Sequence, residues 1–163
     1  MEILNTNQCS DVLESIIKSA DKFVVIISPY IKLNPRVDSF LQMANDKDVP
    51  VFIVTRHLLD KEEYSKIKNL NRLVICIHPP LHAKTYFNEN EVLISSLNLY
   101  EFSQQNNTEI GVSFFKEDYK DEFKVVSDQL FDILNDKRSK IVVDKLAEKE
   151  WKKFEKDISR RWF

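Results

Sequence analysis

The sequence predicts an α/β domain in which a mixed, largely parallel sheet is flanked by helices on both faces, with a helical extension at the C-terminus. The first half of the chain alternates amphipathic helical segments with short runs that are apolar at every position, as strands covered on both faces are. After Pro80, three strand-like stretches follow one another with no helical pattern between them. Beyond Lys116, apolar residues recur at helical spacing to the end.

Each helix in the first half begins at a capping residue, because Ser, Asn and Asp side chains accept hydrogen bonds from the free N–H groups of a first turn. The expected starts are Ser10, Asn34 followed by Pro35, and Asp60 with Glu63 at capping-box spacing. The strands between and after these helices are residues 23–27, 51–55 and 73–77. The last of them stops at Pro79-Pro80, since proline has no N–H to donate to a sheet.

The second half is expected to contain strands at residues 83–87, 92–95 and 109–115. Asn88-Glu89-Asn90 has the composition of a tight turn, which predicts a hairpin between the first two of these strands. The remaining chain is expected to be helical, with a hinge at residues 135–139.

Composition excludes several classes of function. The 24 Lys and Arg residues against 26 Asp and Glu give a net charge of −2, unlike that of a basic DNA-coating protein. No apolar run approaches the roughly 18 residues that span a bilayer, and residues 1–11 do not resemble a signal peptide, so we expect a cytoplasmic protein without a membrane partner. Cys9 and Cys76 are the only thiols, which argues against a disulfide framework or a cysteine metal cluster.

The residues most suggestive of chemistry are His82, Lys84, Ser96 and Asn98. His82 and Lys84 lie two apart, so on an extended strand they point to one side, and Ser96 with Asn98 repeats that spacing. A hairpin would bring the four together around a phosphate, with a cation, hydrogen-bond donors and a free imidazole to attack phosphorus. Separately, the first pair is typical of a solvated strand edge and the second of a turn.

This segment resembles the signature of the phospholipase D superfamily: His-x-Lys, four residues, Asp, about six residues, then Gly-Ser-x-Asn. The two pairs match it, whereas Glu89, or Asn88 with a different gap, stands at the Asp, and Ser95 at the Gly. In the superfamily the acidic residue of the motif is understood to shape the site rather than to transfer the proton, so the resemblance still implies activity. Ser95 would narrow the backbone approach to the phosphate. The resemblance extends over residues 10–115 and includes the strand ending in Ile27-Ser28-Pro29-Tyr30.

In the small nucleases of this superfamily, a glutamate about eleven residues after the motif Asn hydrogen-bonds the catalytic His. Glu109 stands at that position relative to Asn98, and the resemblance therefore implies that Glu109 orients His82. Such a carboxylate fixes the tautomer of an imidazole and raises its basicity. The alternative for Glu109 is an ordinary charge at the end of a strand.

The resemblance also implies a two-step mechanism that uses no metal and no cofactor. One His forms a phosphohistidine, and a second His protonates the leaving oxygen and then activates water. Because neither His57 nor His78 has a Lys two residues on, the second motif is expected from a homodimer. A metal pair of His78 and His82 is disfavoured, because Pro79-Pro80 prevents helical i, i+4 geometry.

We therefore expect a metal-independent endonuclease that cleaves DNA rather than RNA, since small members of the superfamily with a single copy of the His-x-Lys motif are mostly nucleases. The alternatives are a phospholipase-type or other phosphodiesterase, and a non-catalytic nucleic-acid-binding module with a degraded site. The expected catalytic domain is residues 1–135, with residues 136–163 packed on it or on the dimer mate. Aromatic and cationic residues at 151–154 and 160–163 would either stack bases or pack on a neighbouring surface.

Overall fold

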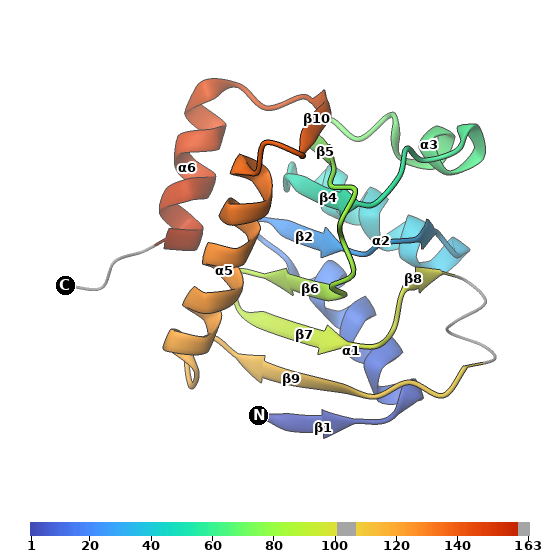
Figure 1. Ribbon diagram of the computed structural model, residues 1–163, viewed down its shortest axis with the longest axis vertical. Helices are drawn as coiled ribbons and strands as arrows, with labels where there is room; N and C mark the ends of the chain where they lie inside the picture. Colours follow the sequence, from blue (N-terminus) through green and yellow to red (C-terminus); the bar gives the residue numbers. More distant parts are fainter. Residues whose placement is uncertain (101–106, 160–163) are drawn as a thin grey trace.

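An eight-stranded sheet runs through the protein between two layers of helices, in a computed structural model that describes residues 1–100 and 107–159 (Figure 1). The strand order is β1-β9-β7-β6-β2-β4-β5-β10. The bounds are β1 Glu2–Leu4, β2 Val24–Ile27, β4 Val51–Thr55, β5 Leu73–Ile77, β6 Thr85–Asn88, β7 Glu91–Ser95, β9 Gly111–Phe115 and β10 Lys140–Asp144. A smaller parallel sheet pairs β3 (Ile31–Lys32) with β8 (Leu99–Tyr100).

The mixed sheet with helices on both faces is confirmed, but its parallel part is smaller than the sequence predicts. Only β2, β4 and β5 pair in parallel; β6, β7 and β9 follow as antiparallel neighbours, and β1 and β10 add antiparallel edges. The reason is connection length, because a tight turn such as the one between β6 and β7 can only join antiparallel strands.

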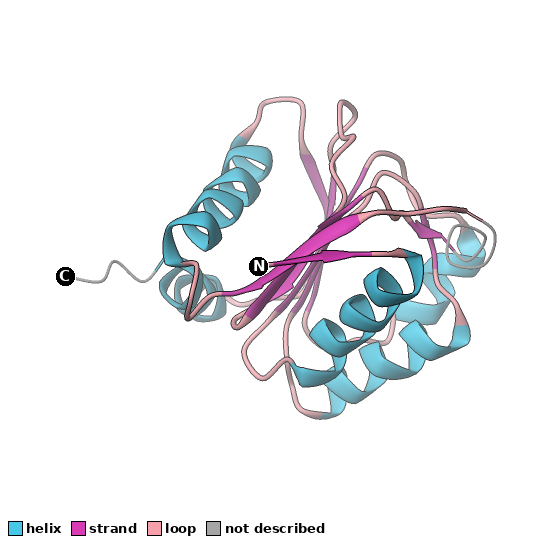
Figure 2. Ribbon diagram, turned by 90° about the horizontal axis from the view of Figure 1, so that it is seen from below, coloured by secondary structure: helices cyan, strands magenta, loops and turns pink. Residues whose placement is uncertain are grey.

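Helices α1 (Thr6–Ser19), α2 (Pro35–Asp46) and α3 (Lys61–Ile67) cover one face of the sheet, and α5 (Lys120–Asn135) and α6 (Glu148–Ser159) cover the other (Figure 2). Alternate residues of β2 enter the two cores, so Val24 and Ile26 pack under the first layer and Val25 and Ile27 under the second. No helix among the described residues is long and apolar enough to cross a membrane.

The capping residues agree with the sequence at two of three helices. Asn34 caps α2 and Asp60 caps α3, each through its side chain. The first helix begins earlier than expected, because Asn5 and Gln8 form a capping box and Ser10 lies inside α1, where its hydroxyl donates to the Thr6 carbonyl.

The C-terminal extension is not wholly helical, and that expectation was wrong at residues 140–144. These residues form β10, since Ile141, Val142 and Val143 are β-branched and complete the sheet beside β5. Helix α6 then returns over the sheet, where Phe154 stacks on Phe52 with ring centroids 3.8 Å apart. Phe154 is thus a packing residue, whereas residues 160–163 lie outside the described part of the chain.

Gly111, the only glycine, lies where β9 crosses α1. A Cβ there would be 2.8 Å from Cys9 Sγ and 3.1 Å from both the Ile94 carbonyl oxygen and Ser95 Cβ. We therefore expect Gly111→Ala to lower the free energy of unfolding by about 1–3 kcal/mol in urea titrations. In the double variant with Cys9→Ala the two losses should be less than additive, because the sulfur is gone. Full additivity would contradict this account.

His78 is buried at the end of β5, where Ser139 Oγ lies 2.8 Å from its Nδ1. Burial lowers the pKa of His78, Asp136 opposes this shift and Arg138 adds to it. Because the unfolded chain takes up this proton at a higher pH, stability should decline as the pH falls below about 6.5.

This decline is measured by urea unfolding between roughly pH 7.5 and pH 5. The variant His78→Gln should lack this component of the decline, because its amide does not titrate, whereas the exposed-residue control His57→Gln should keep it. An unchanged profile in His78→Gln would show that other groups cause the decline.

Candidate active site

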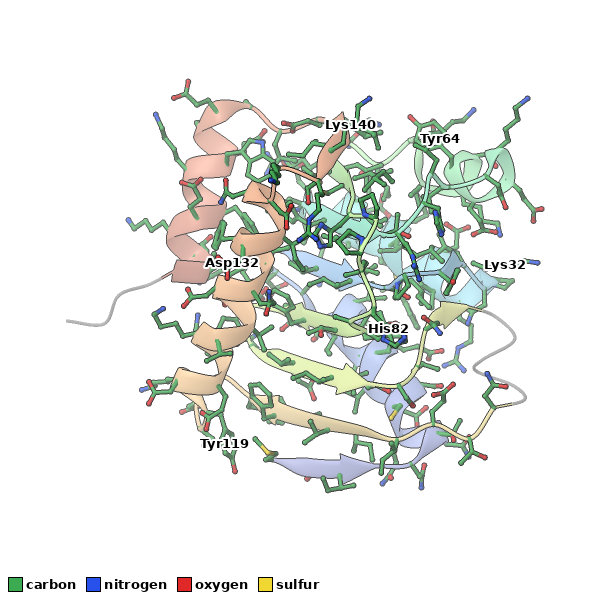
Figure 3. All side chains as sticks on the ribbon, in the orientation of Figure 1. Lys32, Tyr64, His82, Tyr119, Asp132 and Lys140 are labelled. Atoms are coloured by element: carbon green, nitrogen blue, oxygen red, sulfur yellow. The ribbon has the colours of Figure 1, made fainter. Side chains whose placement is uncertain are left out.

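His82 is positioned by the turn that ends β5. The Leu81 N–H donates to the His78 carbonyl at 3.0 Å across Pro79-Pro80, and the Leu81 side chain is buried in the core beneath α5 and α6. The next residue is therefore turned outward, and His82 is exposed at the edge of the sheet just before β6 (Figure 3). No hydrogen bond to the His82 ring is present among the described residues. The imidazole is accessible to a ligand.

Lys84 lies beside His82, although the two are not on a strand. The strand begins at Thr85, two residues later than the sequence predicts, and Lys84 Nζ donates to the His82 carbonyl oxygen at 2.9 Å. Pairing still reaches this residue, because the Ser95 N–H donates to the Lys84 carbonyl at 3.2 Å. The hairpin thus holds the start of the motif against its end.

Ser96 and Asn98 follow β7 at the same edge of the sheet. Between them Leu97 is buried, and its carbonyl accepts a hydrogen bond from the Tyr86 hydroxyl at 2.7 Å. Asn98 Oδ1 is buried yet accepts no hydrogen bond from the described residues. Buried polar atoms nearly always have a partner, so this oxygen is available to a hydrogen-bond donor.

Glu109 reaches this edge from the chain leading into β9, and its side chain is buried. Its Oε2 accepts a hydrogen bond from Ser96 Oγ, and its N–H donates to Thr6 Oγ1 at 2.8 Å. The Ser96 hydroxyl also accepts from the Ile110 N–H at 3.1 Å. Glu109 therefore lies in the site region with Ser96 as its partner, and its expected bond to His82 stays a prediction.

Two buried groups near Glu109, the Tyr86 hydroxyl and the Cys9 thiol, are uncharged. Burial raises the pKa of Tyr86 well above its ordinary range, with the Ser28 hydroxyl opposing this shift and the Glu109 carboxylate adding to it. Burial also raises the pKa of the Cys9 thiol, partly offset by Ser95 and reinforced by Glu109. Both groups are therefore neutral at pH 7.

The acidic position of the motif lies at the far end of the hairpin. The Glu89 carboxylate accepts the N–H groups of Asp21, Lys22 and Phe23 at 2.9, 3.2 and 3.4 Å. Asn88 likewise binds the Ile16 carbonyl at 2.8 Å through its side-chain amide. Glu89 thus fastens the β6–β7 turn to the chain that leads into β2, and Asn88 fastens it to α1, so both have a structural role.

Two further features bear on the site. A cavity of about 790 Å³ lies at the Glu89 end of the hairpin and includes none of the predicted site residues. Ser28, which sequence analysis did not single out, accepts from the Leu99 N–H at 3.0 Å and so holds the chain after Asn98 against β2. The sequence feature that could have indicated Ser28 is that a serine directly follows an otherwise apolar strand. Among the described residues, no group of three His, Cys, Asp or Glu side chains is arranged to hold a metal ion.

The fold is shared with several solved structures. The phospholipase D family member Nuc from Salmonella typhimurium aligns over 86% of this chain and 97% of its own length, with 14% identity and a TM-score of 0.65. NucT from Helicobacter pylori aligns over 81% and 98%, with 14% identity and a TM-score of 0.62. Phosphatidylserine synthase from Haemophilus influenzae aligns over 98% of this chain but 45% of its own, with 14% identity and a TM-score of 0.66.

Sequence comparison points the same way. No curated protein matches the sequence. A family model described as cardiolipin synthase, PLD-like domain, matches residues 13–131, which is well over half of the chain. That range contains the hairpin, both halves of the motif and Glu109. The chain therefore belongs to this family of PLD-like domains, and with it to the phospholipase D superfamily.

Proposed function

We propose that the protein is a metal-independent phosphodiesterase that cleaves DNA through a phosphohistidine at His82, in a site completed by a second copy of the chain. Membership of the superfamily supports phosphodiesterase-type activity in general. The observation that carries the proposal is that the β6–β7 hairpin sets the chain carrying His82 and Lys84 against the chain carrying Ser96 and Asn98, at one end of the sheet.

In the first step, an unprotonated His82 nitrogen attacks phosphorus while the bond to the leaving oxygen breaks. The lone pair of the imidazole forms the new N–P bond, and the leaving oxygen takes a proton from the partner's His82. Lys84 offsets the negative charge on the equatorial oxygens, and the Asn98 amide donates a hydrogen bond to one of them.

In the second step, water attacks the phosphohistidine and regenerates His82. The partner's His82, now unprotonated, accepts the proton from water, so each imidazole returns to its starting state. Glu109 acts as a positioning residue, because its bond to Ser96 fixes the end of β7 beside the start of β9. The first step needs an unprotonated imidazole as the nucleophile and a protonated imidazole as the acid at the same time. One histidine cannot be both, so the second imidazole must come from the second copy of the chain.

The need for a second copy is also supported by the surface beside the motif. Ile94 and Ile110 flank Ser96 and are 41% and 64% exposed. Exposed branched apolar side chains next to a polar site suit an interface between subunits. Light scattering should give the mass of a dimer, and Ile110→Lys should yield a monomer with little activity. An active monomer would contradict the shared site.

Metal removal gives the direct test of the proposed chemistry. We expect the purified protein to cleave plasmid or single-stranded DNA at the same rate with and without EDTA, because the nucleophile and acid are imidazoles. Abolition by EDTA and recovery with a divalent cation would contradict the proposal. Turnover of a phospholipid alone would indicate the phospholipase-type alternative, and DNA binding without cleavage the degraded binding module.

A further inference from the structure

An exposed aromatic pair stands next to the motif and takes no part in the proposed chemistry. Tyr30 follows β2, and its side chain is 50% exposed. His57 follows β4 and is also exposed, with its ring centroid 6.3 Å from that of Tyr30 and the two planes tilted by 43°. Neither side chain has a hydrogen bond among the described residues.

The backbone fixes Tyr30 beside Asn98. The parallel pairing of β3 with β8 sets Ile31 opposite Leu99, so Tyr30 and Asn98 are the residues immediately before that pair. Ser28 Oγ donates to the Tyr30 carbonyl at 2.7 Å and accepts from the Leu99 N–H at 3.0 Å, which joins the two segments. Tyr30 is therefore held next to the motif amide.

The same segment runs alongside the start of the motif. Ile27 is opposite Thr85 in the antiparallel pairing of β2 with β6, so the chain after Ile27 lies beside residues 82–84. Figure 3 shows Lys32, which comes after β2, and His82, which comes before β6, at the same end of the sheet. The aromatic pair thus adjoins the position of the reacting phosphorus on the side of β4.

The backbone joins Arg56 and His57 to the segment that carries Tyr30. The Arg56 N–H donates to the Pro29 carbonyl at 3.4 Å, and Thr55 Oγ1 donates to the same carbonyl at 3.2 Å. The partly exposed Arg56 guanidinium has no ion pair among the described residues. A cation and two rings therefore stand at the edge of a phosphate site, in the combination that holds the backbone and bases of a single strand.

We propose that Tyr30 and His57 form a stacking platform for a base next to the scissile phosphate, so that the preferred substrate is single-stranded nucleic acid. The inference rests on the proposed function for the position of that phosphate. In a duplex the base faces are covered by their neighbours, so only an unpaired strand offers a face to these rings. Arg56 binds the phosphate that follows the stacked base.

Binding is measured by fluorescence anisotropy in a His82→Asn background, which prevents cleavage. The probes are a labelled single-stranded oligothymidylate, an abasic strand of the same length and a duplex. We expect the single strand to bind best, and Tyr30→Leu to weaken its affinity about tenfold or more, since base stacking on an aromatic ring contributes that much. Affinity for the abasic strand should not change, and Tyr30→Phe or Tyr30→Trp should restore binding.

Tyr64→Leu is the matched control, because Tyr64 is a 38% exposed tyrosine on α3. Equal binding of the abasic and base-bearing strands, equal loss in Tyr64→Leu, or preference for the duplex would overturn the inference. So would conversion of the dimer to a monomer by Tyr30→Leu, which would make the pair a contact between copies. Failure of wild-type protein to cleave any diester would instead refute the proposed function and leave the binding result standing.

Discussion

Replacing His82 by asparagine is expected to lower the rate of the proposed DNA cleavage by about 10⁴-fold or more, because in the proposed mechanism this histidine is the nucleophile and, in the second copy, the acid. The melting temperature should stay within a few degrees of wild type, since the His82 side chain is exposed and its ring has no hydrogen bond among the described residues. Rates are compared under single-turnover conditions, which separate the chemical step from product release.

Lys84→Met should also slow the reaction, by about 10²-fold or more, because a fixed cation on the transferred phosphate is lost. Lys149→Met, at an exposed position on α6, provides the surface control. If His82→Asn retained a tenth of the wild-type rate, the histidine would not be the nucleophile.

Replacing Glu89 by alanine is expected to destabilise the fold by about 3 kcal/mol, since three main-chain N–H groups would lose a charged acceptor. For a domain of this size that loss lowers the melting temperature by about 10 °C. The rate per folded molecule should not change, because Glu89 lies at the opposite end of the hairpin from His82.

Glu117→Ala is the matched control for this experiment, because Glu117 is an exposed glutamate near the same turn and should contribute less than about 0.5 kcal/mol. Glu89→Gln should give an intermediate loss, since an amide oxygen still accepts hydrogen bonds. A stable Glu89→Ala protein with abolished turnover would instead place the acid in the reaction.

The variants of His82 and Glu89 separate a catalytic role from a structural role, and the motif alone does not distinguish the two. The turn composition of Asn88-Glu89-Asn90 predicted a hairpin between the two halves of the motif, and β6 and β7 form that hairpin. The partner of Glu109 could not be predicted, because counting residues from Asn98 places the side chain near the site without deciding between Ser96 and His82. That choice depends on how β9 and α1 meet at Thr6.

The strands that sequence analysis missed are all short or edge elements. β1 has three residues and lies at an edge, so it carries little periodicity, and its register depends on β9 more than a hundred residues away. β3 and β8 have two residues each, yet their pairing is what sets Tyr30 beside Asn98. Buried strands such as β2 were predictable, because apolar residues at every position admit few alternatives.

The stereochemical course at phosphorus tests the central claim most directly. A chiral phosphorothioate at the scissile position reports configuration after cleavage in isotopically labelled water. Two successive displacements, first by His82 and then by water, invert the centre twice, so the account predicts overall retention. Overall inversion would mean that water attacks the diester directly, and it would contradict the phosphohistidine intermediate.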